Sequence, residues 1–311
     1  MILITGGTGF IGSYLVEKLL KEGREVRLLV RNPKKIKWKV EHVVGDITDR
    51  RSVREALRDA DGVYHLAAIF RHGVNPSIIW KANYQGTVNL IEEALRQNVE
   101  KFLHVSTVGV IGYANSKPLD ETAPYKPNPN AYSQSKAKAE EYVLQMHKEH
   151  GIDVRVIRPA FVYGIGNTYG LNLLIDTVAK GKLKWVIGDG SNYIHPIHVL
   201  DLVDAITTVM EKGGSGEIYI AANESPVTLR DFLDLVAKLS GRKVRYGFPP
   251  TLARLILRLR GGIGDSSAEE TILAFTKNWF YSVEKLKSLG WRQRMGLEDG
   301  VREVIEWLFS T

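Results

Sequence analysis

Tyr132 and Lys136 lie four residues apart in a segment with the amphipathic pattern of a helix. This spacing puts both side chains on one helix face, one turn apart. A phenol is a weak base at neutral pH, but a neighbouring ammonium favours the phenolate and lowers its pKa. Tyr132 is therefore a candidate for exchanging a proton with a substrate hydroxyl or carbonyl group. Ser106 and Thr107 end the strand expected before this helix, which strengthens the assignment.

Gly6, Gly9 and Gly12 follow a short apolar run and open an apolar-periodic stretch that begins with Phe10 and Ile11. Glycines in such a strand–turn–helix context allow a tight turn and the close approach of a pyrophosphate. The free N–H groups of the helix N-terminus then meet the phosphate charge. We expect these five residues to bind a nicotinamide dinucleotide, with hydride passing between its nicotinamide and the substrate.

The end of the second expected strand bears on the choice between NAD and NADP. A carboxylate there would bond the adenosine ribose of NAD, but this strand ends in Arg31 and Asn32. An arginine at this place favours the 2′-phosphate of NADP through a charge-assisted hydrogen bond. We therefore expect NADP to be preferred, with an exposed Arg31 and the use of NAD as the alternative.

Short β-branched runs alternate with amphipathic stretches over the first half of the chain, which predicts an α/β fold with a doubly wound parallel sheet of the Rossmann type. The strands are expected at 1–5, 25–30, 41–44, 62–65, 101–106 and 153–157, and the helices at 11–21, 52–58, 78–97 and 132–150. The dinucleotide-binding domain is placed at 1–158, with 194–222 packing back on it. A smaller C-terminal substrate-binding lobe is placed at 159–193 and 223–311, with Gly261, Gly262 and Gly264 as a flexible break.

The 311 residues carry 42 basic and 35 acidic side chains and no cysteine. The net charge of +7 is dispersed, so we expect a solvated surface and no nucleic-acid partner. The absence of cysteine excludes disulfides and thiolate metal sites. His195 and His198 are three residues apart, but Pro196 and an apolar context favour structural roles, so no metal is expected. Without an apolar run near 18 residues or a leader pattern, we expect a cytoplasmic protein with no membrane partner.

Several further segments carry a family resemblance that spans essentially the whole chain. With the glycine turn, Tyr132 and Lys136, they are Gly45 to Ile47, His65 to Ala68, Asn83 to Thr87, Arg158 with Pro159, Val162 to Gly164, Leu289 to Trp291, and 300–307. On these residues the chain resembles the extended short-chain dehydrogenase/reductases, a superfamily of nucleotide-sugar epimerases, dehydratases and dihydroflavonol-reductase-like enzymes.

The resemblance implies roles for individual residues. Tyr132 would be the general acid/base and Lys136 its partner, which also bonds the nicotinamide ribose. Thr107 would hold the reacting oxygen, since it precedes the tyrosine by the family's 25 residues. The remaining cofactor contacts would be Asp46 and Ile47 at the adenine, Ala67 and Ala68 beneath the dinucleotide, and Pro159 and Val162 at the nicotinamide. Asn83 would support the site, with helix capping or packing as an equal alternative.

Departures from the family pattern bear on the reaction. Val108 and Gly109 follow Thr107 where dehydratases carry an Asp-Glu pair, and no arginine stands just before the segment at His195 to Val199. In family members that act on nucleotide sugars, an arginine at that position binds the diphosphate. Here Arg230, Arg254 or Arg258 would have to bind it instead. Residues 69–73 and Arg31 resemble reductase-like members.

We therefore expect an NAD(P)-dependent carbonyl reductase or alcohol dehydrogenase acting on a small molecule, with a nucleotide-sugar epimerase that keeps its NAD bound as the alternative. A non-catalytic NADP sensor or RNA-binding protein is a third reading, which the complete set of Thr107, Tyr132 and Lys136 disfavours. The long helices at 78–97 and 132–150 resemble the family's four-helix dimer interface, so a homodimer is expected.

Overall fold

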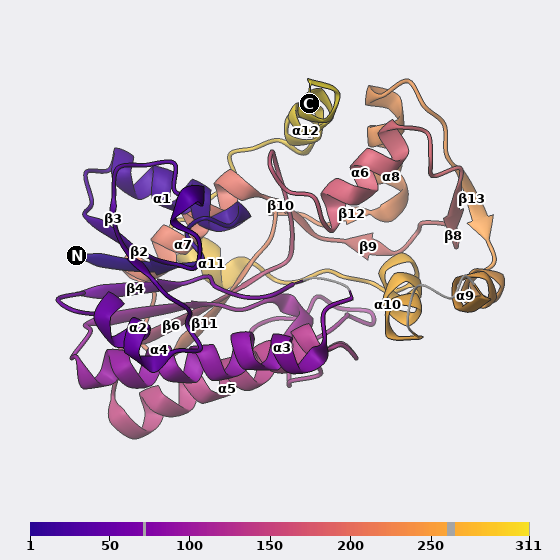
Figure 1. The fold of residues 1–311 in the computed structure, drawn as a ribbon. Coiled ribbons are helices and arrows are strands. Elements are labelled where there is room, and N and C mark those ends of the chain that lie inside the picture. Colours follow the sequence, from indigo (N-terminus) through magenta and orange to yellow (C-terminus); the bar gives the residue numbers. More distant parts are fainter. Residues whose placement is uncertain (71–72, 260–264, 311) are drawn as a thin grey trace. The chain divides into compact units, whose positions relative to one another are not determined.

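The strand order of the N-terminal sheet is β11-β6-β5-β4-β1-β2-β3, and the five pairings from β6 to β3 are parallel (Figure 1). The structure is a computed structural model that describes residues 1–70, 73–259 and 265–310, with the main chain alone at 258, 259 and 265–270. The expected Rossmann-like α/β fold is confirmed. The order reverses between β1 and β4, the kind of switch point at which doubly wound sheets bind ligands.

Two compact units divide the chain: the first comprises residues 1–110, 130–158 and 203–219, and the second 111–129, 159–202 and 220–311. The strands of the large sheet are β1 (Ile2–Thr5), β2 (Val26–Val30), β3 (Glu41–Val44), β4 (Gly62–His65), β5 (Lys101–Val105), β6 (Val154–Pro159) and β11 (Glu217–Ala221). The helices between them are α1 (Phe10–Lys21), η1 (Pro33–Lys35), α2 (Arg50–Ala56), α3 (Pro76–Trp80), η2 (Lys81–Gln85), α4 (Gly86–Arg96), η3 (Val108–Val110), α5 (Ala131–His150) and α7 (Val199–Lys212).

The central strands are buried from end to end, because helices cover both faces of the sheet. On one face α2, α4 and α5 pack on an apolar core that includes Leu90, Val143 and Val156. On the other, Lys18 of α1 forms an ion pair with Asp204 of α7 at 3.0 Å. This layered arrangement fixes the carboxyl ends of the strands, where the candidate residues lie.

Helix α5 has clear signals at both ends. Its N-cap residue Asn130 accepts a hydrogen bond from the main-chain N–H of Ser133 at 2.7 Å, and its C-cap Gly151 has a φ of +72°. Tyr132 and Lys136 therefore lie in the first turns of a helix of 20 residues. The sequence placed this helix within one residue of its actual start.

The expected single helix at 78–97 differs from what is found. It is divided into α3, the π-helical segment η2 and α4. The buried side chain of Asn83 lies within the π-helical segment and bonds outside the helix. Hydrophobic periodicity does not detect such an insertion, because the apolar face continues on both sides of it.

The second unit has its own core of buried apolar side chains, among them Tyr163, Ile175, Phe232 and Val304. Its elements are β7 (Phe161–Tyr163), α6 (Leu171–Ala179), β8 (Trp185–Ile187), β9 (Tyr193–Ile194), β10 (Pro196–His198), β12 (Val227–Thr228), α8 (Leu229–Leu239), β13 (Arg245–Phe248), α9 (Pro250–Leu259), α10 (Asp265–Thr276), α11 (Glu284–Ser288) and α12 (Leu297–Ser310). The expected break at Gly261, Gly262 and Gly264 lies outside the described residues.

Among the described helices, none combines the length and the apolar character that a membrane span requires.

Candidate active site

The glycine turn connects β1 to α1 as the sequence predicts. Gly9 is the N-cap of α1; it is exposed, no side chain caps the helix, and the first turn holds no acid. A Cβ built on Gly9 would meet only the main-chain oxygen of Gly6, at 3.2 Å. An uncapped helix N-terminus beside an open main chain suits a pyrophosphate, so these residues fit a dinucleotide.

Gly6 and Ala67 meet at the switch point of the sheet. Gly6 has a φ of +75°, and a Cβ there would lie 2.7 Å from the main-chain nitrogen of Ala67. A Cβ on Gly12 would lie 2.1 Å from the oxygen of Gly6. Both positions therefore require glycine for the packing of the turn itself, whereas a Cβ on Gly9 meets a single atom. Ala67 is partly buried and Ala68 is exposed beyond it.

Arg31 extends from the end of β2, with 72% of its side chain exposed. Its nearest acidic partner is Asp46, 4.0 Å away after β3. Asp46 is held in place because its carboxylate accepts the N–H of Thr48 at 2.9 Å, and Ile47 beside it is buried. The residues expected at the adenosine end therefore gather at one edge of the sheet.

The phenol of Tyr132 on α5 lies close enough to the side chain of Thr107, just after β5, for that side chain to act on its pKa. Thr107 Oγ1 also accepts the main-chain N–H of Gly109 at 3.1 Å. Burial raises the pKa of Tyr132 to about 12, although Thr107 opposes this rise. The phenol therefore keeps its proton at neutral pH.

The side chain of Lys136 is directed at strand β5. Its Nζ donates to the main-chain oxygen of Val105 at 2.7 Å and lies 3.2 Å from Nε2 of His104. Burial lowers the pKa of Lys136 to about 7, against the raising effect of Glu140. Desolvation therefore outweighs the charge of Glu140 at Lys136, and the lowering of the Tyr132 pKa by Lys136 stays a prediction.

Ser106 and Thr107 are adjacent in the chain but contact different side chains. The hydroxyl of Ser106 donates to the carboxylate of Glu140, and Ser106 is only 4% exposed. Arg158, at the end of β6, donates to the same carboxylate from Nη2 at 2.6 Å and from Nε at 3.0 Å. Sequence reasoning missed Glu140. The signal was its position four residues after Lys136, on the same helix face.

Asn83 connects the loop after β4 to α5. Its side chain accepts the N–H of Ile69 at 2.7 Å and donates to Ser135 Oγ at 3.1 Å. Asn83 therefore connects this loop to the helix that carries Tyr132 and Lys136, and its support of the site stays a prediction beside packing and capping. On the same loop, the ring of Phe70 lies edge-on to Tyr132 with centroids 4.7 Å apart.

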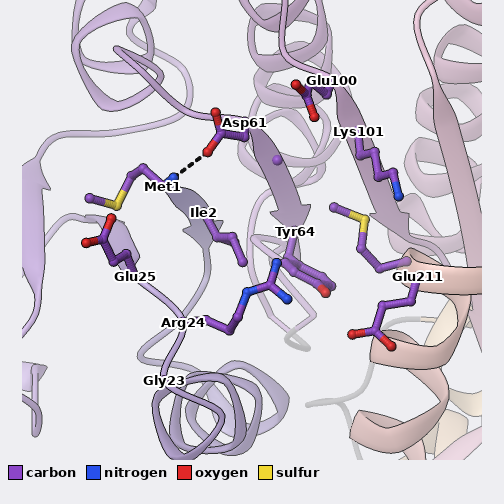
Figure 2. A pocket seen from close by; sticks show the side chains of 12 residues that line it. Met1, Ile2, Gly23, Arg24, Glu25, Asp61, Tyr64, Glu100, Lys101 and Glu211 are labelled. Carbon is purple, nitrogen blue, oxygen red and sulfur yellow. Dashed lines mark hydrogen bonds and ion pairs between the residues drawn. The ribbon is translucent and has the colours of Figure 1, made fainter.

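A cavity of about 380 Å³ opens in the first unit at the amino ends of β1, β4 and β5 (Figure 2). Ile2 and Tyr64 form part of its apolar lining, with Arg24 and Glu211 beside them. The candidate residues lie at the carboxyl ends of the same strands, so this cavity contains none of them.

A model of the NAD-dependent epimerase/dehydratase family matches residues 2–222. The chain belongs to this family. Its fold and motifs confirm the expected membership of the extended short-chain dehydrogenase/reductase superfamily, whose members are enzymes that use a nicotinamide dinucleotide.

Relatives of this family member have different activities. A ketoreductase of Stigmatella aurantiaca that acts on a farnesylated dihydroquinoline oxide is 32% identical over 79% of the chain and 75% of its own length. A putative UDP-glucose 4-epimerase of Methanocaldococcus jannaschii is 28% identical over 99% of the chain and 98% of its own. The structure of Thermus thermophilus UDP-glucose 4-epimerase with NAD aligns at a TM-score of 0.81 and 26% identity, covering 99% of this chain and 98% of that one.

In the second unit of this family enzyme, both histidines of the expected structural pair have protein partners. His195 Nε2 lies 2.7 Å from the oxygen of Asn223, and its Nδ1 accepts the N–H of Tyr281 at 3.1 Å. Burial lowers the pKa of His195 to about 4, so it is neutral. His198 Nε2 lies 2.7 Å from Glu303. Within the described residues, no group of three or more metal-ligating side chains is found.

The remaining residues that bear on the choice of reaction form contacts with neighbouring protein groups. Asn192, near the place of the missing arginine, donates to the oxygen of Lys277 at 3.0 Å. Arg230 donates to the oxygen of Asp189 and stacks over Tyr246 at 4.0 Å. Arg71, His72 and the side chain of Arg258 lie outside the described residues. In the second unit, Pro159 ends β6 and Val162 pairs with Ile197 in the β7–β10 sheet.

Proposed function

We propose that the protein is an NAD(P)-dependent oxidoreductase that reduces a carbonyl group or oxidises the corresponding hydroxyl group of a small molecule. The proximity of Tyr132 to Thr107 supports this proposal most, because Thr107 follows β5 at the carboxyl end of the sheet that also bears the glycine turn. A bound nicotinamide supplies or accepts the hydride at the substrate carbon.

Tyr132 acts in the proposed reaction as the general acid/base. With a pKa raised to about 12, it holds its proton and is suited to donate it to a carbonyl oxygen as that oxygen gains negative charge. The single hydroxyl proton of Thr107, which faces the phenol in the free protein, is donated to the same oxygen when a substrate is bound. In the reverse direction the phenolate has to form, and the ammonium of Lys136 on the same helix face stabilises it.

We propose that Gly6, Gly9, Phe10, Ile11 and Gly12 hold the pyrophosphate. The open face of Gly9 and the uncapped start of α1 support this assignment. The remaining contacts are proposed at Asp46 and Ile47 for the adenine, at Ala67 and Ala68 beneath the dinucleotide, at Lys136 for the nicotinamide ribose, and at Pro159 and Val162 for the nicotinamide end.

NADP is the proposed preferred cofactor. The exposed guanidinium of Arg31 at the end of β2 is available to a 2′-phosphate. Its ion pair with Asp46 is long, at 4.0 Å, so a phosphate can replace Asp46 as its partner. Equilibrium titration of the purified protein with each reduced dinucleotide tests the preference, and tighter binding of NADH would reject it.

Among the activities of the family, the reductase is favoured over the dehydratase and the epimerase. Val108 and Gly109 form a buried 3-10 turn after Thr107, which offers neither an acid nor a base for elimination. The side-chain amide of Asn192 donates to the main-chain oxygen of Lys277. This supports the view that no side chain at this position binds a diphosphate. The ketoreductase relative agrees with this choice.

A nucleotide-sugar epimerase remains the second candidate, and the epimerase relatives that align over nearly the whole chain favour it. Net change in the nicotinamide absorbance separates the two, because an epimerase returns its hydride to the same substrate. We expect absorbance to fall when NADPH is mixed with a panel of ketones. Native mass spectrometry that finds retained NAD with a nucleotide sugar would establish the epimerase instead.

We propose a homodimer in which α4 and α5 face a second copy. The two helices lie side by side, with Tyr142 donating to Glu92 at 2.7 Å. Light scattering at low micromolar concentration tests this state, and the mass of a single chain would exclude it. The second unit is proposed to supply the substrate contacts.

A further inference from the structure

Three residues form a row along one face of α5. Tyr132, Lys136 and Glu140 are spaced by four, and all three contact either the last residue of β5 or one of the two residues that follow it. Tyr132 contacts Thr107, Lys136 contacts Val105, and Glu140 contacts Ser106. The row therefore connects three consecutive turns of the helix to three consecutive residues, 105–107, at the point where β5 ends.

Glu140 is the most firmly held member of the row. It is fully buried, and Arg158 is 1% exposed beside it. Two nitrogens of Arg158 donate to the carboxylate, and Ser106 donates to its second oxygen. A bidentate arginine pair fixes orientation as well as distance. Glu140 thus joins α5 to both β5 and β6.

Several titratable groups lie near Lys136, and they differ in the charge that they carry. Its titratable neighbours are His104 on β5, His65 on β4, and Tyr132 and Glu140 on α5, with Arg158 of β6 behind Glu140. Burial lowers the pKa of both histidines well below the usual range. They are therefore neutral, and neither of them stabilises the Lys136 ammonium by charge. Glu140 is the group whose charge raises the pKa of Lys136.

We propose that Glu140 is a positioning residue for the Tyr132–Lys136 pair: its carboxylate, fixed by Arg158 and Ser106, holds α5 in register with β5 and supplies a fixed negative charge one helical turn from Lys136. This inference rests on the proposed function for its effect on catalysis. Its effect on Lys136 is a property of the cofactor-free chain and is testable there.

The direct test is an NMR titration of the cofactor-free protein labelled with ¹³C at the lysine ε-carbon. Lys136→Arg identifies the resonance of Lys136. We expect a midpoint near pH 7 in the unaltered chain. In Glu140→Gln the midpoint should fall by about one pH unit, because an opposite charge nearby favours the ammonium. An unchanged midpoint in folded Glu140→Gln would overturn the proposal.

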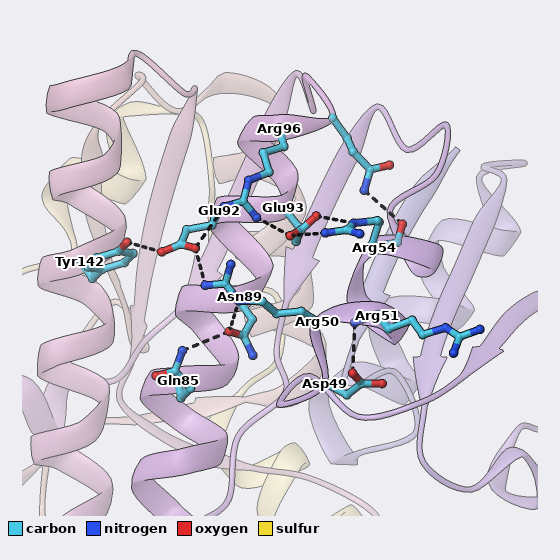
Figure 3. A network of polar contacts seen from close by, with 11 residues as sticks. Asp49, Arg50, Arg51, Arg54, Gln85, Asn89, Glu92, Glu93, Arg96 and Tyr142 are labelled. Carbon is cyan, nitrogen blue, oxygen red and sulfur yellow. Dashed lines mark hydrogen bonds and ion pairs between the residues drawn. The ribbon is translucent and has the colours of Figure 1, made fainter.

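Glu93 provides a matched control on α4 (Figure 3). Its side chain is 1% exposed, and Arg54 and Arg96 both donate to it, as Arg158 does to Glu140. Glu93→Gln removes a buried carboxylate of the same kind from a different network. We expect it to lower the thermal midpoint of unfolding and to leave the Lys136 titration unchanged. A fall of the Lys136 midpoint equal to that in Glu140→Gln would show a general effect and overturn the proposal.

A double variant addresses the loss of folding that an unpaired Arg158 can cause. Glu140→Leu with Arg158→Met replaces both members of the pair by apolar side chains of similar size, an exchange that often leaves stability unchanged. If the pair is merely structural, this variant titrates at Lys136 as the unaltered chain does. We expect the lower midpoint instead.

Kinetics complete the test for the holoenzyme. If Lys136 must be charged, the high-pH limb of kcat should move down by about one pH unit in Glu140→Gln, a roughly tenfold loss of kcat on that limb. Glu93→Gln should keep the original limb, and an unmoved limb in Glu140→Gln would contradict the catalytic part of the proposal. A chain without hydride-transfer activity would reject the proposed function and leave the NMR result standing.

Discussion

The side chain of Thr107, just after β5, lies beside the phenol of Tyr132 in the first turn of α5 and lowers its pKa against the effect of burial. This placement distinguishes Thr107 from its neighbour Ser106, whose hydroxyl is used by Glu140. The sequence spacing favoured Thr107 over Ser106 for the substrate oxygen, and the contacts support that choice.

Replacing Tyr132 by Phe removes the proposed proton donor. We expect kcat to fall by about 10²- to 10⁴-fold, since this is the usual contribution of general acid–base catalysis. Dinucleotide affinity should stay nearly normal. Steady-state kinetics and equilibrium titration measure the two quantities.

Tyr142→Phe serves as its control. Tyr142 lies on the same helix and donates to Glu92, away from β5. It should keep its full turnover. Unchanged turnover in Tyr132→Phe, or an equal loss in both variants, would refute the role of Tyr132.

The glycines of the turn should respond differently to alanine. At Gly9 a Cβ meets only one oxygen at 3.2 Å, so we expect the free energy of unfolding to change by less than about 1 kcal/mol. Dinucleotide binding should weaken at least tenfold, because the methyl group occupies the space of the pyrophosphate.

At Gly12, by contrast, the Cβ would lie 2.1 Å from a main-chain oxygen. Gly12→Ala should therefore lower both stability and binding. Urea unfolding and calorimetric titration measure the pair. Full dinucleotide affinity in Gly9→Ala would contradict the proposed site.

Removing the charge of Arg31 should act on one cofactor alone. In Arg31→Ala we expect NADPH to bind roughly 10- to 100-fold more weakly, the value of a charge-assisted hydrogen bond of about 1.5–3 kcal/mol. NADH lacks the 2′-phosphate and is the internal control, so its dissociation constant should not change. An equal loss for both dinucleotides would mean that Arg31 supports the fold of this edge.

Lys136 should make stability depend on pH. Its pKa is lowered to about 7 in the folded chain from an ordinary value of 10.5, so the unfolded chain binds more protons between these values. The free energy of unfolding should therefore rise from pH 7 to 10, with a slope of up to about 1.4 kcal/mol per pH unit.

Urea unfolding at pH 7, 8 and 9 measures the slope. Lys136→Met carries no titratable group at this position and should give a flatter dependence than the unaltered chain. Identical slopes in the two proteins would show that Lys136 is not buried as a neutral amine.

The sequence predicted the sheet well because its signals are local. Strands β3 and β4 begin and end where alternation and apolar runs placed them, and the glycine turn follows β1 directly. The register of Tyr132 and Lys136 on one face also follows from spacing alone.

Features that depend on partners distant in the sequence were not predictable. The segment containing Glu140 reads as a solvated helix face, and only the fold shows that Arg158 and Ser106 enclose it. The lowered pKa of Lys136 was not predictable for the same reason: a sequence contains the charges but not their burial. The π-helical segment around Asn83 was hidden within a continuous periodic pattern.

Strand β11 has a consequence for how the chain acquires its fold. It is the strand next to β6 in the sheet, yet the two are separated in the sequence by residues 160–216, which include most of the second unit's segment 159–202 and all of α7. During synthesis, the edge of β6 stays open until residues 217–221 have left the ribosome. Pairing over such a sequence separation is slow, and an exposed strand edge invites aggregation. Truncations that end before Glu217 should therefore be poorly soluble even though they contain the complete glycine turn and Tyr132.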